Sequence, residues 1–133
     1  MQSFEEVRSH VSGHHTLGSN EPYLISIELP LDGTRRQGVY LSELEDDDGR
    51  RFLRVSSPVA PLGDIAPQRC LRFNWTQRVG YLALNDLDSV PYLQLCENRP
   101  YAGLDSAELD RLIQTIGQLA DRLERLAAQT DAH

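Results

Sequence analysis

The amino-acid sequence predicts an α+β fold, in which residues 1–133 form a single domain with an antiparallel five-stranded sheet and helices on one face. Three observations lead to this prediction. Five segments have the alternation or composition of strands, turn sequences join most of them, and a long amphipathic helix pattern comes last. The expected order of elements is α-β-β-β-α-β-β-α, and a chain of 133 residues has the length for one hydrophobic core.

The first expected element is a short helix over residues 3–11. Ser3 and Glu6 have the spacing of a capping box, in which the two side chains satisfy free backbone N–H groups at a helix start. The apolar residues fall at i, i+3 and i+7: Phe4, Val7 and Val11. Glycine and small polar residues over 12–20 then end the helix.

Five strands are expected after this helix, and turn-forming residues separate most of them. The first three form a meander, with turns over residues 30–33 and 46–49. A segment with three prolines, 58–67, is expected to be a connection, and residues 85–89 are expected to turn a second hairpin. The expected strands span residues 23–29, 39–44, 51–57, 78–84 and 90–97.

The strongest helical pattern lies at the C-terminal end of the sequence. Asp105 and Glu108 are spaced to cap its first turn. Apolar side chains then repeat along one stripe, which requires a sheet or a partner to cover it. The stripe consists of Leu109, Leu112, Ile113, Ile116, Leu119, Ala120, Leu123, Leu126 and Ala127.

Period-two alternation divides the strand residues into two faces. The aliphatic set predicts the core: Ile25, Ile27, Leu29, Val39, Leu41, Leu53, Val55, Leu82, Leu84, Leu93 and Leu95. The opposite face mixes polar residues with four aromatic ones, Tyr40, Phe52, Tyr81 and Tyr92. Aromatic side chains among polar neighbours are typical of binding surfaces. Two interpretations stay open: a partner or dimer surface, or ordinary coverage by the short helix or the N-terminal segment.

Residues 68–76 fit either a short helix or a strand edge. Leu71, Phe73 and Trp75 are the candidates here for a dimer or partner contact, and simple core packing is the alternative. Arginines interleaved with aromatic residues in this stretch would also suit nucleic acid. The net charge of the chain opposes that third interpretation.

Charge limits the classes of partner that this chain suits. Twenty acidic residues face thirteen arginines and no lysine, so the net charge is −7 and the isoelectric point is about 5.0. Such a balance disfavours binding to nucleic acid or to anionic membranes, and it suits a basic or amphipathic protein segment. The N-terminal sequence lacks the pattern of a secretory signal, and two cysteines are too few for a disulfide framework. A cytoplasmic protein is therefore expected.

Residue patterns that carry catalysis or bind metal are weak in this sequence. His10, His14 and His15 lie close together, but they fit surface histidines better than a metal cluster. The acidic run 46–49 fits a hairpin turn better than a calcium loop. Nucleophile elbows and phosphate-binding glycine loops are missing from the sequence. We therefore expect no enzyme activity, no metal and no cofactor.

The C-terminal half resembles the YbjN family. The similarity rests on Leu71 and Asn74 before a hairpin, Gly103-Leu104-Asp105 with Leu109 at the start of the last helix, and Ala120-Asp121 with Leu123 within it. The element order is similar to that of class I type III secretion chaperones, with which YbjN is grouped structurally. This resemblance implies a small, acidic, cytoplasmic and homodimeric bacterial protein that binds the N-terminal segment of a secreted effector without ATP.

The sequence therefore predicts a non-catalytic domain that holds a segment of a partner protein. Apolar contacts are the expected mode, with strand addition to a sheet edge as a second mode. The alternative is a YbjN-like regulatory or scaffold protein without a client.

Overall fold

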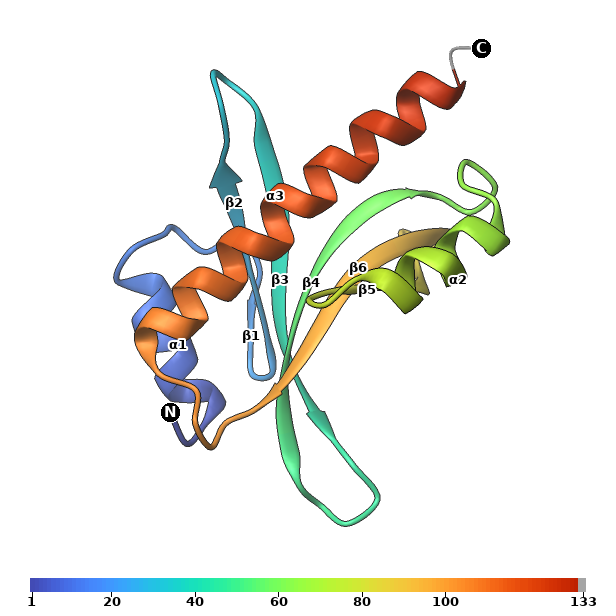
Figure 1. Cartoon of the computed structure of the whole chain (residues 1–133). Coiled ribbons are helices and arrows are strands. Elements are labelled where there is room, and N and C mark those ends of the chain that lie inside the picture. Colours follow the sequence, from blue (N-terminus) through green and yellow to red (C-terminus); the bar gives the residue numbers. More distant parts are fainter. Residues whose placement is uncertain (132–133) are drawn as a thin grey trace.

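An antiparallel sheet of six strands forms the centre of the fold, and helices cover one of its faces (Figure 1). The computed structural model describes residues 1–131. The strands lie in the order β1-β2-β3-β4-β6-β5, so β1 and β5 form the two edges. The helix α3 crosses the sheet, and its first turns lie beside α1 (Figure 1).

Nine elements make up the described chain. The helices are α1 (Phe4–Ser12), α2 (Pro67–Thr76) and α3 (Ser106–Asp131). The strands are β1 (Asn20–Glu21), β2 (Leu24–Pro30), β3 (Arg36–Glu45), β4 (Arg51–Pro61), β5 (Tyr81–Leu87) and β6 (Val90–Pro100). The expected helix order is confirmed, and residues 68–76 belong to a helix rather than to a strand edge.

The expectation of five strands is wrong because the chain forms a sixth, β1, along the edge of β2. This strand has two residues, both exposed, so it carries no hydrophobic alternation. Backbone bonds hold the segment beside it: Gly18 N–H donates to Ser26 O at 2.8 Å, and Ser26 N–H donates to Ser19 O at 3.1 Å. A strand defined by such pairing alone leaves no pattern in the sequence.

The two hairpins extend further than the sequence predicts. The proline-rich stretch was expected to be a connection from Pro58, but β4 continues to Pro61, with a register shift between Pro58 and Ala60. A bulge tolerates such prolines because one residue there has no ladder partner. The second hairpin closes with a two-residue turn rather than over residues 85–89. Asp88 and Ser89 have positive φ angles of 51° and 68°, as in a type I′ turn.

The core lies between one face of the sheet and the helices. Ten of the eleven aliphatic residues assigned to it by alternation are buried, and so is most of the α3 stripe. Leu84 is the exception, since its side chain is 54% exposed. It lies on the edge strand β5, so alternation with the buried Leu82 does not make it part of the core. Leu126 is 52% exposed toward the end of α3.

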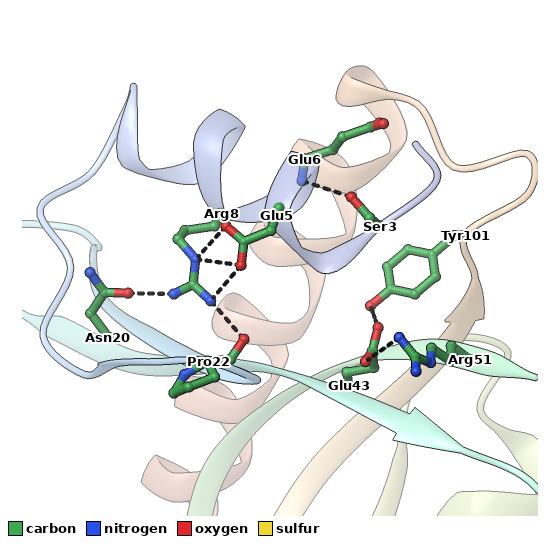
Figure 2. Close-up of polar contacts among 9 residues, drawn as sticks. All are labelled: Ser3, Glu5, Glu6, Arg8, Asn20, Pro22, Glu43, Arg51 and Tyr101. Carbon is green, nitrogen blue, oxygen red and sulfur yellow. Dashed lines mark hydrogen bonds and ion pairs between the residues drawn. The ribbon is translucent and has the colours of Figure 1, made fainter. Parts of the chain in front are cut away.

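Polar side chains fix the helix starts and tie α1 to the sheet. Ser3 accepts from the Glu6 amide at 3.3 Å, and Asp105 accepts from the Glu108 amide at 2.8 Å, so both expected N-cap bonds are confirmed. The Glu6 carboxylate accepts from the Gln2 amide rather than from that of Ser3. Arg8 on α1 reaches the β1–β2 segment, where it bonds to the Asn20 side chain and to Pro22 O (Figure 2). These contacts hold β1 against the helical layer.

A second polar contact links β3 to the loop before α3. Tyr101 donates from its hydroxyl to Glu43 Oε1 at 2.9 Å, and Arg51 lies 3.9 Å from the other oxygen of that carboxylate (Figure 2). Burial and the bond to Glu43 raise the pKa of Tyr101 well above its ordinary value. The phenol therefore stays a neutral donor at physiological pH.

Candidate partner-binding site

A hollow of about 500 Å³ lies on the face of the sheet opposite the helices. It extends over residues from five strands, β2 to β6. Its lining mixes aromatic and aliphatic side chains with small and polar ones. The lining residues are Leu24, Tyr40, Ser42, Arg54, Ser56, Tyr81, Ala83, Leu84, Asn85, Asp86, Leu87, Gln94 and Cys96.

Strand register explains the shape of this hollow. Tyr40 faces Ser56, Ser56 faces Cys96, and Cys96 faces Tyr81 across adjacent strands. Directly opposed residues share a face of the sheet, so these four form one row from β3 to β5. Two small side chains therefore lie between two tyrosines. The hollow is the space that this row leaves open.

Arg54 supplies a positive charge beside this row. Its Nε donates to Asn98 Oδ1 at 3.3 Å, and within the described part of the chain it forms no ion pair. Cys96 is a buried free thiol in the lining; burial raises its pKa, and the Arg54 charge acts in the opposite direction. The hollow thus combines tyrosine and aliphatic side chains with polar ones, and its charged lining residues are Arg54, which forms no ion pair among the described residues, and Asp86.

The structure separates the four aromatic residues that the sequence grouped on one face. Tyr40 and Tyr81 line the hollow. Phe52 lies two residues along β4 from Arg54, facing Leu44 and Pro100, under the Arg50 guanidinium. Tyr92 faces Pro61 and Asn85 outside the hollow. Burial and then the negative charges of Glu124 and Asp64 raise the pKa of Tyr92.

The helix α2 presents a second apolar surface. Leu71 and Trp75, four residues apart on one side of the helix, are 70% and 90% exposed. Core packing is therefore the wrong interpretation for these two residues. Phe73 is half-buried on the other side and packs against the core, beside Leu82 and Leu123. We call the surface formed by Leu71 and Trp75 the α2 surface.

Asn74 fixes the position of α2 against the edge strand β5. Its Oδ1 accepts from the Leu82 amide at 2.7 Å, and its Nδ2 donates to Leu82 O at 3.1 Å. One side chain thereby satisfies both backbone groups that Leu82 presents on the free edge of the sheet. In the sequence, Asn74 is distinguished only by the resemblance to the YbjN family. Its structural role depends on a contact that periodicity does not reveal.

We expect Asn74→Ala to lower the free energy of unfolding by about 2 kcal/mol, because it removes two half-buried hydrogen bonds of about 1 kcal/mol each. Chemical denaturation measures this loss. The Leu82 amide is also expected to lose protection in hydrogen exchange. Asn85→Ala, an exposed substitution on the same strand, is the control and should change the free energy of unfolding by less than about 0.5 kcal/mol. Equal effects of the two substitutions would contradict the role of Asn74.

The histidines near α1 take part in a polar contact between helices. His10 Nε2 lies 2.8 Å from Asp110 Oδ1 on α3, and the His14 ring lies edge-on to His10 with centroids 4.8 Å apart. Among the residues that the structure describes, no three His, Cys, Asp or Glu side chains are arranged to hold a metal ion. In the same part of the chain, no helix is long and apolar enough to span a membrane.

Comparisons with known proteins find similarity in structure alone. No protein-family model matches the chain, and no curated protein matches its sequence. Among solved structures, a chain of the HopA1–SchA chaperone–effector complex matches with a TM-score of 0.60 and 17% identity, over 91% of this chain and 88% of that one. A chain of the ExsC–ExsE complex matches with a TM-score of 0.69 and 17% identity, over 96% and 97%.

These structural likenesses support the fold that the resemblance implies. They support an α+β fold of the type III secretion chaperone kind, with six strands in place of the expected five. At 17% identity they show the fold alone. The resemblance to the YbjN family stays a prediction.

Proposed function

Starting from a fold shared with a chain of a chaperone–effector complex, we propose that this protein is a non-catalytic, chaperone-like binding domain. It would hold a segment of a partner protein, for which a secreted effector is our first candidate. The cytoplasm would be its place of action. The single observation that carries the proposal is the hollow between Tyr40 and Tyr81, on the sheet face that no helix covers.

The hollow supports binding because its tyrosines offer a large contact area and lose little conformational entropy when a partner binds. Tyrosine rings bury a large area while few rotatable bonds lose freedom, so they contribute strongly to interfaces. A concave surface also removes more of a ligand from water than a flat face does. Phe52 and Tyr92 lie outside the hollow, so we assign them to the periphery of the proposed partner surface rather than to its centre.

We further propose that the protein is a homodimer and that the α2 surface forms its interface. Five of the seven large apolar side chains that the described chain exposes lie within residues 62–90: Leu62, Leu71, Trp75, Leu84 and Val90. Leu84 lies on the same strand as Leu82, which Asn74 ties to α2. Tryptophan is frequent among residues that dominate interface energies. Phe73 would support this interface from the core side.

Affinity capture of the partner from a lysate of the cells that make this protein tests the proposed function. The wild-type chain is expected to retain one stoichiometric partner, identified by mass spectrometry. The double variant Tyr40→Ala, Tyr81→Ala is expected to lose at least nine-tenths of it, because both sides of the hollow are removed. Tyr23→Ala is the control, since Tyr23 is 60% exposed and does not line the hollow.

Circular dichroism and thermal unfolding of the variants decide whether a loss of capture reflects the site. Both tyrosines are partly exposed, so we expect the double variant to fold. A loss of partner in a folded double variant supports the proposal. Capture by the double variant at the wild-type level would contradict it. A wild-type chain that elutes alone would instead favour the regulatory or scaffold alternative.

A further inference from the structure

The hollow on the open face is too wide for a single strand and suits a helix. Tyr40 and Tyr81 lie three strands apart in one row, which places their Cα atoms about 14 Å apart at a spacing of about 4.8 Å per strand. Serine and cysteine are the residues between them. An α-helix with its side chains is about 10–12 Å in diameter, which fits within this Cα separation.

Backbone hydrogen bonding points to the same occupant. The central strands β3, β4 and β6 are paired on both sides, so their backbone groups are used within the sheet. A peptide that lies on this face therefore finds no backbone partners there, and an extended peptide would leave its own N–H and C=O groups unsatisfied. A helix satisfies these groups internally. Strand addition, by contrast, needs an edge such as β5.

The positive charge of Arg54 indicates that a helix bound in the hollow carries an acidic side chain. Arg54 is half-buried beside the row and has no acidic partner in the described part of the chain. The carboxylate of Asp86 also lines the hollow, but Asp86 faces Pro91, seven residues along β6 from the Asn98 that Arg54 contacts. That offset is roughly 23 Å along the strand. A carboxylate from the occupant can therefore pair with Arg54 without competition.

We propose that the hollow binds an amphipathic α-helix of the partner protein, with its apolar stripe between Tyr40 and Tyr81 and an Asp or Glu paired with Arg54. This inference rests on the proposed function and adds the chemistry of the partner. A partly desolvated pair between a guanidinium and a carboxylate also selects for sequence, because a partner that lacks the acid leaves the arginine unpaired. Partner helices without an acidic residue at this position are therefore expected to bind more weakly.

A displayed library of random 16-residue peptides, selected on the full chain, tests this proposal. We expect the enriched peptides to carry apolar residues at i, i+3, i+4 and i+7 with an acidic residue beside the stripe. A synthetic copy of the best binder should gain helical circular dichroism when it binds. Arg54→Gln should weaken binding about tenfold or more, and Arg54→Lys should restore part of the loss. Arg72→Gln on α2, outside the hollow, is the control and should change nothing.

A double-mutant cycle then isolates the charge pair. If the acidic residue of the peptide contacts Arg54, its change to Gln or Asn should weaken binding to the wild-type chain but not to the folded Arg54→Gln variant. Binders with period-two alternation, or binders indifferent to Arg54, would overturn the helix proposal while partner binding at the hollow stands. Binders indifferent to Tyr40→Ala and Tyr81→Ala, or enrichment of no peptide, would count against the hollow as a binding site altogether.

Discussion

Gly80→Ala is expected to lower the free energy of unfolding by about 2–4 kcal/mol. Gly80 precedes β5 with a φ of 95°, a conformation that costs other residues about 1–2 kcal/mol. A Cβ atom there would also lie 3.1 Å from Leu95 Cδ1 and 3.4 Å from Ile116 Cδ1, in a fully buried part of the core. Overpacking of this kind typically costs about 1–3 kcal/mol.

Gly63→Ala separates the two causes of this effect. Gly63 has a φ of 106°, yet its added Cβ would meet no atom within 4 Å. We therefore expect Gly63→Ala to cost only the conformational part, about 1–2 kcal/mol. Denaturant unfolding of the two variants gives both values. If Gly63→Ala destabilised the protein as much as Gly80→Ala, the close packing of Leu95 and Ile116 around Gly80 would be refuted.

The double variant Leu71→Ala, Trp75→Ala is expected to convert the proposed homodimer to monomers. Removal of two central apolar residues from an interface typically costs about 2 kcal/mol or more each, which raises the dissociation constant by roughly 10³-fold or more. Both side chains are largely exposed in the single chain, so the fold itself should lose less than about 0.5 kcal/mol. Sedimentation velocity over a range of concentrations measures the dissociation.

A matched substitution outside the α2 surface serves as the control for this variant. Tyr23→Ala removes an exposed aromatic residue near the opposite edge of the sheet and should leave the dimer intact. Two results would refute the proposed interface: a wild-type chain that is monomeric at micromolar concentration, or a double variant that dimerises as the wild type does. Either result would leave the proposed partner site on the open face unaffected.

The sequence predicted the core well because burial leaves a direct pattern. Ile25, Ile27 and Leu29 alternate along β2, and Leu109, Leu112 and Ile116 repeat along α3 at helical spacing. Leu84 has the same alternation as its buried neighbours and yet lies exposed. Alternation gives the side of the sheet on which a residue lies. Whether another element covers Leu84 depends on what packs against the edge strand β5, and alternation along the strand does not indicate this.

The candidate site was predictable in part. Alternation placed Tyr40 and Tyr81 on the open face, but it could not show that they share a row, because this depends on the register of four strands. For the same reason it could not separate Phe52 and Tyr92 from them. Arg54 was overlooked because an arginine on the polar side of a strand looks like a solvent contact. Its significance comes from the absence of an acidic neighbour in the described structure.

Photo-crosslinking in the cells that make this protein tests whether a partner binds at the hollow on the open face. A benzoylphenylalanine at Ser42, a small residue that lines the hollow, is compared with one at Gln118, an exposed residue of α3. We predict a crosslinked adduct with one partner protein from position 42 and none from position 118. An adduct from position 118 alone, or none from position 42 while a partner co-purifies, would contradict partner binding at the open face.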